Sequence, residues 1–162
     1  MNTEKRKIWW VAGIALVLAM PLTFMLINKG APISWGLWTG VNRDRGIAID
    51  GYDPVAFHTA SKAIRGVEAF SHEWNGARWH FVDDDHRARF AADPERYAPA
   101  FGGYCATAAS AGLTFDTDPR VWHIENGELF LFFNADARDD FLKQLDAGVI
   151  ARAHRNYRDG MR

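Results

Sequence analysis

The single cysteine of this chain lies in a sequence context that favours chemistry. Cys105 follows the glycine pair Gly102-Gly103 and Tyr104, and the small residues 106–111 after it predict a short, closely packed helix. A thiolate is favoured where the free N–H groups and the positive dipole of a helix start converge. Cys105 is therefore a candidate catalytic residue. The other interpretation is a small buried hydrophobe, because no Lys, Arg or His stands beside Cys105 in the sequence.

The six histidines form no HExxH or HxH pattern, and the chain has no CxxC pair. His86 follows aspartates 83–85, which indicates either a carboxylate–imidazole site or helix-capping acids beside a surface histidine. His72 falls on the apolar face of a predicted hairpin, where it is either a ligand or a core histidine whose hydrogen bonds are satisfied. The candidate metal ligands are Cys105, His86 and His72. A thiolate with imidazole partners suits Cu or Zn.

Several other function classes find no support in the sequence. The glycine pair lacks the lysine and the serine or threonine of a phosphate-binding loop, and no Ser–His–Asp or paired-carboxylate arrangement can be recognised from spacing alone. From Val41 onward the chain carries 15 basic and 19 acidic side chains. This mildly acidic balance predicts no nucleic-acid partner. A single cysteine also excludes an internal disulfide.

The N-terminal segment predicts a membrane anchor. Residues 8–27 are uncharged and mostly apolar, about long enough to cross the ~30 Å hydrocarbon core as a helix. Three basic residues, 5–7, precede the segment and only Lys29 closely follows it, which predicts a cytoplasmic N-terminus and an exported remainder. A cleaved signal peptide is the rival interpretation. However, the stretch exceeds the usual ~7–15 residues, and no small-x-small cleavage site follows.

We therefore expect a single-pass protein of the inner (cytoplasmic) membrane with four regions. Residues 1–7 are the cytoplasmic N-terminus, residues 8–27 the transmembrane anchor, residues 28–46 a glycine-rich linker, and residues 47–158 one globular domain. The domain lies in the periplasm or an equivalent extracytoplasmic space. Its partners would be the membrane and a protein thiol.

Two Asn-Gly dipeptides predict β-hairpins with type I′ turns, because both central positions of that turn require positive φ. Asn75-Gly76 separates strands at 69–74 and 77–82, and Asn126-Gly127 separates strands at 121–125 and 128–133. The first register places Glu73 beside Arg78. The predicted core faces comprise Phe70, His72, Trp74, Ala77, Trp79 and Phe81 in the first hairpin, and Trp122, Ile124, Leu129, Leu131 and Phe133 in the second.

Short helices are predicted between and after the hairpins. The aspartates 83–85 cap a helix through Phe90 that stops near Asp93-Pro94, and Pro94 starts a short turn. Asn134 caps a final helix that is broken near Gly148 and resumes toward Tyr157. Hairpins with helices between and after them predict a small single α+β domain, preceded by the one transmembrane helix.

Several motifs occur in a characteristic order: IDGYDPVAF at 49–57, WNGARWHF at 74–81, FAADPERYAP at 90–99 and FGGYC at 101–105, followed by DP at 118–119 and GELFL at 127–131. Together they resemble the bacterial YHS-domain proteins, in particular the exported branch that includes selenoproteins. The resemblance covers about residues 47–157. In the selenoprotein members selenocysteine occupies the position matched here by Cys105, which implies a functional thiol. Convergence of the motifs would place Tyr52, Asp53 and Tyr104 in one pocket, as candidate cofactor-binding residues.

The resemblance also removes an expectation. YHS domains of metal-handling proteins and copper pumps carry cysteines in DPVC and FCSxxC elements, and the matching positions here are Ala56, Val82 and His86. A metal site of that type is therefore in doubt. Any site would have to be rebuilt from Cys105 with His86 or another histidine.

Two functional hypotheses follow. The first is a thiol-based redox or metal-handling module, in which Cys105 reacts with a partner thiol or disulfide, or ligates Cu or Zn. The second is a non-catalytic binding or scaffold module in which Cys105 is buried. A sulfur enclosed by apolar side chains, with no histidine nearby, would favour the second hypothesis.

Overall fold

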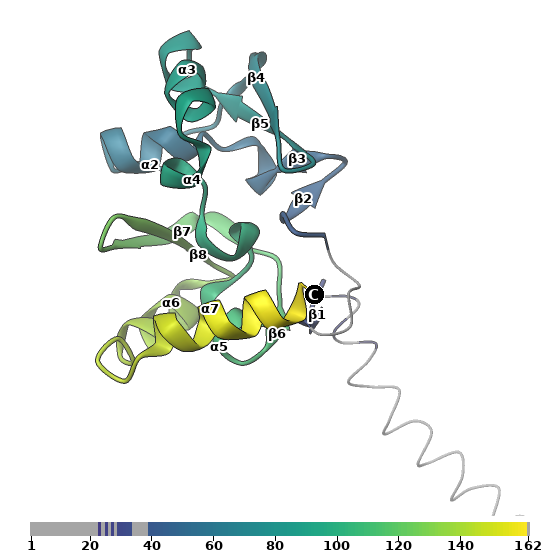
Figure 1. Ribbon diagram of the computed structural model, residues 1–162, viewed down its shortest axis with the longest axis vertical. Helices are drawn as coiled ribbons and strands as arrows, with labels where there is room; N and C mark the ends of the chain where they lie inside the picture. The colour runs from purple at the N-terminus through teal and green to yellow at the C-terminus, as the bar shows by residue number, and fades with distance from the viewer. Residues whose placement is uncertain (1–22, 24, 26, 28, 34–38, 162) are drawn as a thin grey trace, which may run out of the picture.

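The computed structural model describes residues 23, 25, 27, 29–33 and 39–161, and Figure 1 shows the arrangement of the elements. Strands and short helices alternate along the chain in a single α+β domain, as the sequence predicts. The described strands form a four-stranded sheet and two two-stranded sheets. The two predicted hairpins are the longest pairings in these sheets.

The first hairpin joins strands β4 (Val67–Trp74) and β5 (Ala77–Phe81) around Asn75 and Gly76, both with positive φ. Glu73 pairs with Arg78, as predicted, and Arg78 Nε donates to Glu73 Oε1 at 2.8 Å. The same register, continued along the strands, predicts that Phe70 pairs with Phe81, and this pairing is wrong. A bulge between Val67 and Ser71 shifts the register, so Phe81 pairs with Val67. The four-stranded sheet is completed by β2 (Arg43–Asp44) and β3 (Ile47–Ala48), in the order β2-β3-β5-β4.

The second hairpin joins β7 (Asp118–Glu125) and β8 (Glu128–Phe132) around Asn126-Gly127. Trp122 pairs with Leu131 and Ile124 with Leu129, which confirms that face. Phe133 was expected on the same face, but it lies just past the strand and is 43% exposed.

Strand β8 separates two apolar cores, because four consecutive residues, 129–132, are fully buried. Leu129 and Leu131 pack into the core that contains Trp79 and Phe90. Phe130 and Phe132 point to the opposite face and pack into the core that contains Phe141. Successive side chains of a strand point to opposite faces, so one strand supplies both cores. In Figure 1 the elements of these two cores lie above and below the β7–β8 hairpin.

The helices begin at the predicted caps. Asp83 accepts from the N–H of His86 at the start of α3 (Asp84–Ala92), and Asn134 accepts from Ala137 N at the start of α6 (Ala135–Leu142). The remaining helices are α2 (Pro54–Ala60), α4 (Pro94–Tyr97), α5 (Ala106–Ser110) and α7 (Val149–Gly160), with 3-10 turns η2 (Ile49–Gly51) and η3 (Ala100–Gly103). Helix α2 was not predicted. Its signal was present, because Asp53 is an N-cap and Pro54 occupies the first helical position.

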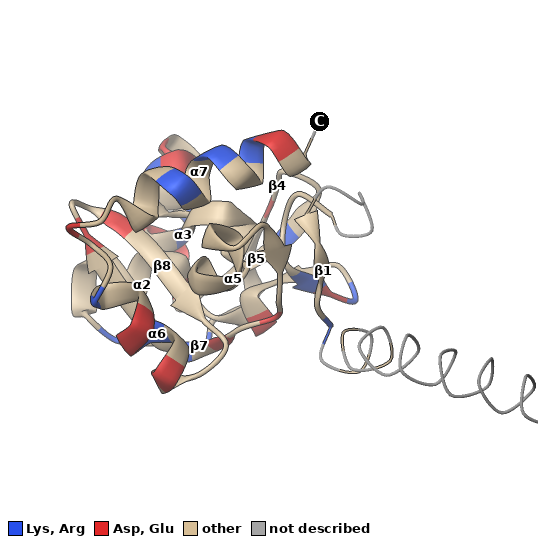
Figure 2. Cartoon of the chain, turned by 90° about the horizontal axis from the view of Figure 1, so that it is seen from below, with Lys and Arg blue, Asp and Glu red and all other residues tan. Residues whose placement is uncertain are grey.

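Helix α7 covers the second core with one face only. Val149 and Ala153 are buried in that core, whereas Arg152, Arg155 and Arg158 lie on the same helix. Figure 2 shows basic residues along α7 and acidic residues on α6. Each helix also carries the opposite sign, with Asp159 on α7 and Arg138 on α6.

The segment expected to be a linker, 28–46, contributes to the fold in its described part. Strand β1 (Ala31–Pro32) pairs with β6 (Leu113–Thr114), and β2 belongs to the four-stranded sheet. Ile33 packs into one core and Val41 into the other. Glycine and proline content indicated a linker, but these apolar side chains anchor the segment to the domain.

The expected membrane anchor, residues 8–27, lies outside the described residues except for 23, 25 and 27. Within the described part of the chain, no helix has the length and apolar character needed to cross a bilayer.

The packing of Trp79 yields a stability prediction. Its ring is fully buried, and its centroid lies 5.1 Å from that of Phe90. Trp79→Ala is expected to lower the free energy of unfolding by about 3–5 kcal/mol in a denaturant titration, as large-to-small core substitutions do. Phe133→Ala is the matched control at an exposed aromatic and should cost less than about 1 kcal/mol. Equal losses in the two variants would refute the assignment of the core.

Candidate functional site

Cys105 lies in an apolar core. The residue is 2% exposed and belongs to the cluster that includes Ala106, Ala109 and Phe130. Its backbone N–H donates to Phe115 O at 3.0 Å, and it forms an isolated parallel bridge with Leu131 of β8. Cys105 is the N-cap of α5, but its side chain makes no capping hydrogen bond. The thiol thus occupies the position of a core residue beside the central strand.

The glycine pair before Cys105 serves a close backbone contact. A Cβ on Gly102 would lie 2.0 Å from the carbonyl oxygen of Gly40, and one on Gly103 would lie 2.7 Å from Ile49 Cγ2. Both glycines have positive φ, which a glycine adopts without steric cost. Asn42 N donates to Gly102 O at 2.8 Å. The glycine pair therefore lets the described part of residues 29–44, which we call the lead-in, pack against η3.

The candidate metal ligands are not brought together. His72 lies opposite Trp79 in the first hairpin, with its ring 6.2 Å from that of Phe90, whereas Cys105 belongs to the other core. His86 contacts neither of them in any described interaction. No group of three or more His, Cys, Asp or Glu side chains in the described residues is arranged to hold a metal ion.

His86 does form a carboxylate–imidazole pair, but with a different carboxylate from those next to it in sequence. Its Nδ1 lies 2.6 Å from Oδ2 of Asp53. The neighbouring Asp85 instead binds Arg89, with Arg89 Nε 2.7 Å from Asp85 Oδ2. Asp53 is fully buried and also accepts from the N–H groups of Val55, Ala56 and Val82. This carboxylate therefore ties α2, β5 and α3 together.

The three candidate pocket residues separate into two places. Asp53 is enclosed, as described above, and the Tyr52 ring carries the guanidinium of Arg65 at 4.7 Å from its centroid. Tyr104 lies elsewhere, with its hydroxyl donating to Thr39 O at 3.0 Å. Tyr52, Asp53 and Tyr104 therefore do not share one pocket, but Tyr104 does line a hollow.

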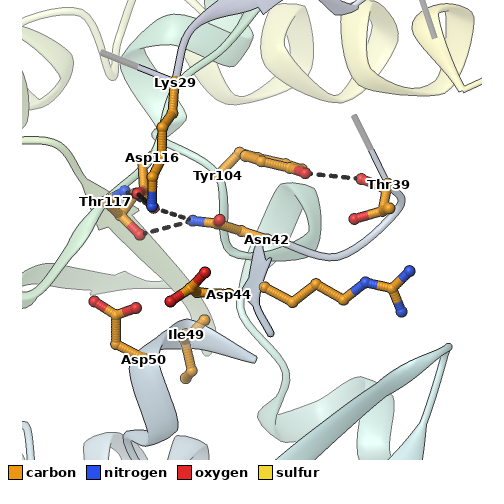
Figure 3. Close-up of a pocket in the computed structure, with 10 residues that line it drawn as sticks. Lys29, Thr39, Asn42, Asp44, Ile49, Asp50, Tyr104, Asp116 and Thr117 are labelled. Carbon is orange, nitrogen blue, oxygen red and sulfur yellow. Dashed lines mark hydrogen bonds and ion pairs between the residues drawn. The ribbon is translucent and has the colours of Figure 1, made fainter. Parts of the chain in front are cut away.

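That hollow has a volume of about 340 Å³ and is walled by segments far apart in sequence. Figure 3 shows its side chains, which come from the lead-in, η2, the end of η3 and the loop before β7. Its lining residues are Lys29, Thr39, Asn42, Arg43, Asp44, Ile49, Asp50, Tyr104, Asp116 and Thr117. We call it the polar pocket. Most of its lining side chains are polar or charged. Asp116 directly follows Phe115, whose carbonyl accepts from the N–H of Cys105.

A hydrogen-bond network fixes one wall of the polar pocket. Asn42 Nδ2 donates to Asp116 Oδ1 at 2.9 Å and contacts Thr117 Oγ1 at 3.3 Å. Lys29 Nζ lies 3.1 Å from Asp116 Oδ2. This hydrogen bond and charge raise the pKa of Lys29 above its ordinary value, so the ammonium stays charged. Asn42 and Lys29 thus hold Asp116 in a fixed orientation.

The opposite wall of the polar pocket carries two more carboxylates, those of Asp44 and Asp50. Burial, followed by the charge of Asp116, raises the pKa of Asp50 above its ordinary value. In Figure 3 the carboxylates of Asp44 and Asp50 lie near each other on this side of the pocket. A second hollow of about 340 Å³ shares these two aspartates and is also lined by Arg65 and His80. Asp44 and Asp50 therefore line both hollows.

The backbone of this wall is strained. Ile49 has φ 41° and Asp50 has φ 54°, in the left-handed region that β-branched side chains rarely adopt. Arg65 Nη1 donates to the carbonyl of Asp50 at 2.7 Å and supports this conformation. Left-handed non-glycine residues cost on the order of 1–3 kcal/mol each and cluster at ligand-binding sites. The strain at the β-branched Ile49 therefore marks the polar pocket as the candidate functional site.

Sequence reasoning missed most of the polar pocket. Asn42, Asp44 and Lys29 fell in the expected linker, and Asp116 lies in a loop without a motif. No local pattern in the sequence indicated that residues 42–44 would lie beside Asp116. They do so because Gly102 lets the backbone at 40–42 pack against η3.

Comparisons with known proteins gave no match to any family model, to any curated protein or to any solved structure.

The burial of Cys105 yields a labelling prediction. Iodoacetamide is expected to leave the folded chain unmodified and to label Cys105 fully in denaturant, because only 2% of the residue is exposed. Mass spectrometry reads the result without ambiguity, since this is the single cysteine. Rapid labelling of the folded chain, at the rate of a free thiol in the same buffer, would instead support the thiol-chemistry hypothesis.

Proposed function

We propose that this protein is a binding module that holds a small polar ligand in the polar pocket. The observation that carries the proposal is the combination of a hollow of about 340 Å³ with a strained residue, Ile49, in its wall. A cavity with a few convergent polar groups is the usual form of a small-molecule site. The network of Asn42, Asp116 and Lys29 supplies preorganised donors and acceptors at its inner wall.

The position of Cys105 supports a binding module over thiol chemistry. A reactive or metal-ligating thiol needs access to a partner or to imidazole ligands, whereas Cys105 lies in the apolar core. We assign it a packing role beside β8. Redox chemistry and binding of Cu or Zn through Cys105 require an opening of this core, and the labelling experiment above tests that opening.

The proposal also covers the location of the protein in the cell and the domain family to which it belongs. We propose that residues 8–27 anchor the chain in the inner membrane and that the domain is a YHS-like module on the extracytoplasmic side. The sequence motifs at 49–57 and 101–105 support the family, and the charge asymmetry around residues 8–27 supports the orientation.

The charge of Asp50 gives a test of the polar pocket. Because its pKa is raised in the folded chain, the unfolded chain loses this proton first, and stability falls as the pH rises through the carboxylate range. At neutral pH Asp50 is ionised in both states, so the full loss of folding stability from its raised pKa is present. Asp50→Asn, which also tolerates positive φ, should therefore melt at a higher temperature than the native chain at about pH 7, with the difference vanishing near about pH 3.

Ligand binding is then measured in the same variant. A thermal-shift screen of amino acids, sugars, polyamines and divalent cations should find a compound that stabilises the native chain and stabilises Asp50→Asn less. Asp146→Asn, at an exposed loop position outside the polar pocket, is the matched control and should respond like the native chain. A compound that stabilises all three proteins equally would bind elsewhere and contradict the proposal.

The anchor has a separate test. Reporter fusions after Asn28 and after Arg162 should be active only outside the cytoplasm, because the anchor orients both positions to that side. N-terminal sequencing of the mature protein should begin near residue 1. A mature N-terminus beyond residue 27 would show a cleaved signal peptide.

A further inference from the structure

Asp53, His86 and Thr59 form a chain of contacts outside the polar pocket. Asp53 Oδ2 lies 2.6 Å from His86 Nδ1, and His86 Nε2 lies 3.5 Å from Thr59 Oγ1. Asp53 precedes α2, Thr59 lies in its last turn, and His86 lies in the first turn of α3. A carboxylate, an imidazole and a hydroxyl thus follow one another from the interior to the surface.

The hydrogen bonds of Asp53 fix the orientation of the imidazole. A carboxylate that accepts from three backbone N–H groups, with His86 as its fourth contact, has no hydrogen to give. His86 Nδ1 therefore carries the hydrogen of this contact. In the neutral ring the lone pair then lies on Nε2, which faces Thr59. Asp53 itself is fully buried, so solvent does not compete for this hydrogen bond.

The capping of α2 does not account for the whole arrangement. Capping uses Oδ1, which accepts from Val55 N and Ala56 N, whereas Oδ2 binds Val82 N and His86. The hydroxyl of Thr59 donates to Val55 O at 3.0 Å in this structure. Because Thr59 is exposed, its hydroxyl hydrogen can turn toward Nε2 without a change in the fold. Catalytic hydrogen bonds are often long in unliganded proteins.

Two other histidine–carboxylate pairs in the described residues provide a contrast. His123 Nε2 lies 3.1 Å from Glu125 Oε2, and His154 Nε2 lies 2.8 Å from Glu128 Oε1. Both carboxylates are about one third exposed, and neither histidine has a described contact with a hydroxyl. Of these three pairs among the described residues, only the Asp53 pair joins a buried carboxylate to a surface hydroxyl.

We propose that Thr59 is a nucleophile for acyl transfer, with His86 as its general base and Asp53 as the positioning residue. Nucleophile, base and orienting group in this order form the arrangement of the serine-type triads. The acyl donor is a small ester with a good leaving group. It is uncharged or cationic, since aspartates 83–85 lie next to His86 in sequence.

The step balances without any additional cofactor. The Thr59 oxygen attacks the ester carbonyl carbon and forms a new C–O bond, while its proton passes to His86 Nε2. The bond from this carbon to the leaving oxygen then breaks, and the same proton passes to that oxygen. A water molecule then attacks the acyl carbon while its proton passes to His86 Nε2. The bond from this carbon to the Thr59 oxygen breaks, the proton passes to that oxygen and restores the hydroxyl, and the carboxylic acid leaves.

The first experiment uses the full chain in detergent micelles with an ethoxy fluorophosphonate probe. We expect one covalent adduct on the peptide that contains Thr59, identified by mass spectrometry. The adduct should be absent in Thr59→Val and should form roughly 10²-fold more slowly in His86→Gln, the usual scale of a lost general base. His123→Gln is the matched control and should label at the native rate.

Two further measurements keep the test decisive. In Asp53→Asn, the ring-nitrogen NMR signals of His86 should show that the hydrogen has left Nδ1. The rate of labelling of Thr59 should fall in the same variant. A purely structural role of Asp53 would not change the tautomer of His86 and the labelling rate together. If His86→Gln does not fold, hydrolysis of p-nitrophenyl acetate is compared in Thr59→Val and in the native chain. Equal hydrolysis in these two, or an adduct at Thr59 that forms equally fast without His86, overturns the proposal.

Discussion

The burial of both faces of β8 is the constraint on which the rest of the domain depends. Leu129 and Leu131 fill one core, and Phe130 and Phe132 fill the other. A two-stranded hairpin alone is marginal in water, so each face of this strand needs its own cover. The first hairpin with α3 provides one cover, and α5, α6 and α7 provide the other. The bridge between Cys105 and Leu131 places the cysteine at the edge of the same strand.

The polar pocket is lined by residues that stand next to both cores. Ile49 belongs to one core and Phe101 to the other, and both hold positive φ. The glycine at position 102 allows residues 40–42 to approach η3. Polar residues at 42–44 then line the pocket together with Asp116 and Thr117 of the loop before β7. The buried side chain of Ile49 holds its strained backbone in place.

Local signals in the sequence predicted the elements well. Asn-Gly turns located both hairpins, and the caps Asp83 and Asn134 located α3 and α6. The bulge between Val67 and Ser71 was not predicted, although the apolar pair Ala69-Phe70 interrupts the alternation of apolar and polar residues there. The site was predicted poorly because its contacts join residues that are far apart in sequence. Asp53 joins His86 across 33 positions, and Asn42 joins Asp116 across 74. Such contacts follow from packing rather than from local sequence.

The ion pair of Lys29 with Asp116 links distant parts of the chain. Lys29 precedes strand β1, and it is also part of the pocket wall. Asp116 in turn accepts from the amide of Asn42. One carboxylate therefore joins positions 29, 42 and 116, so the ammonium of Lys29 and the amide of Asn42 are held in place by the same side chain.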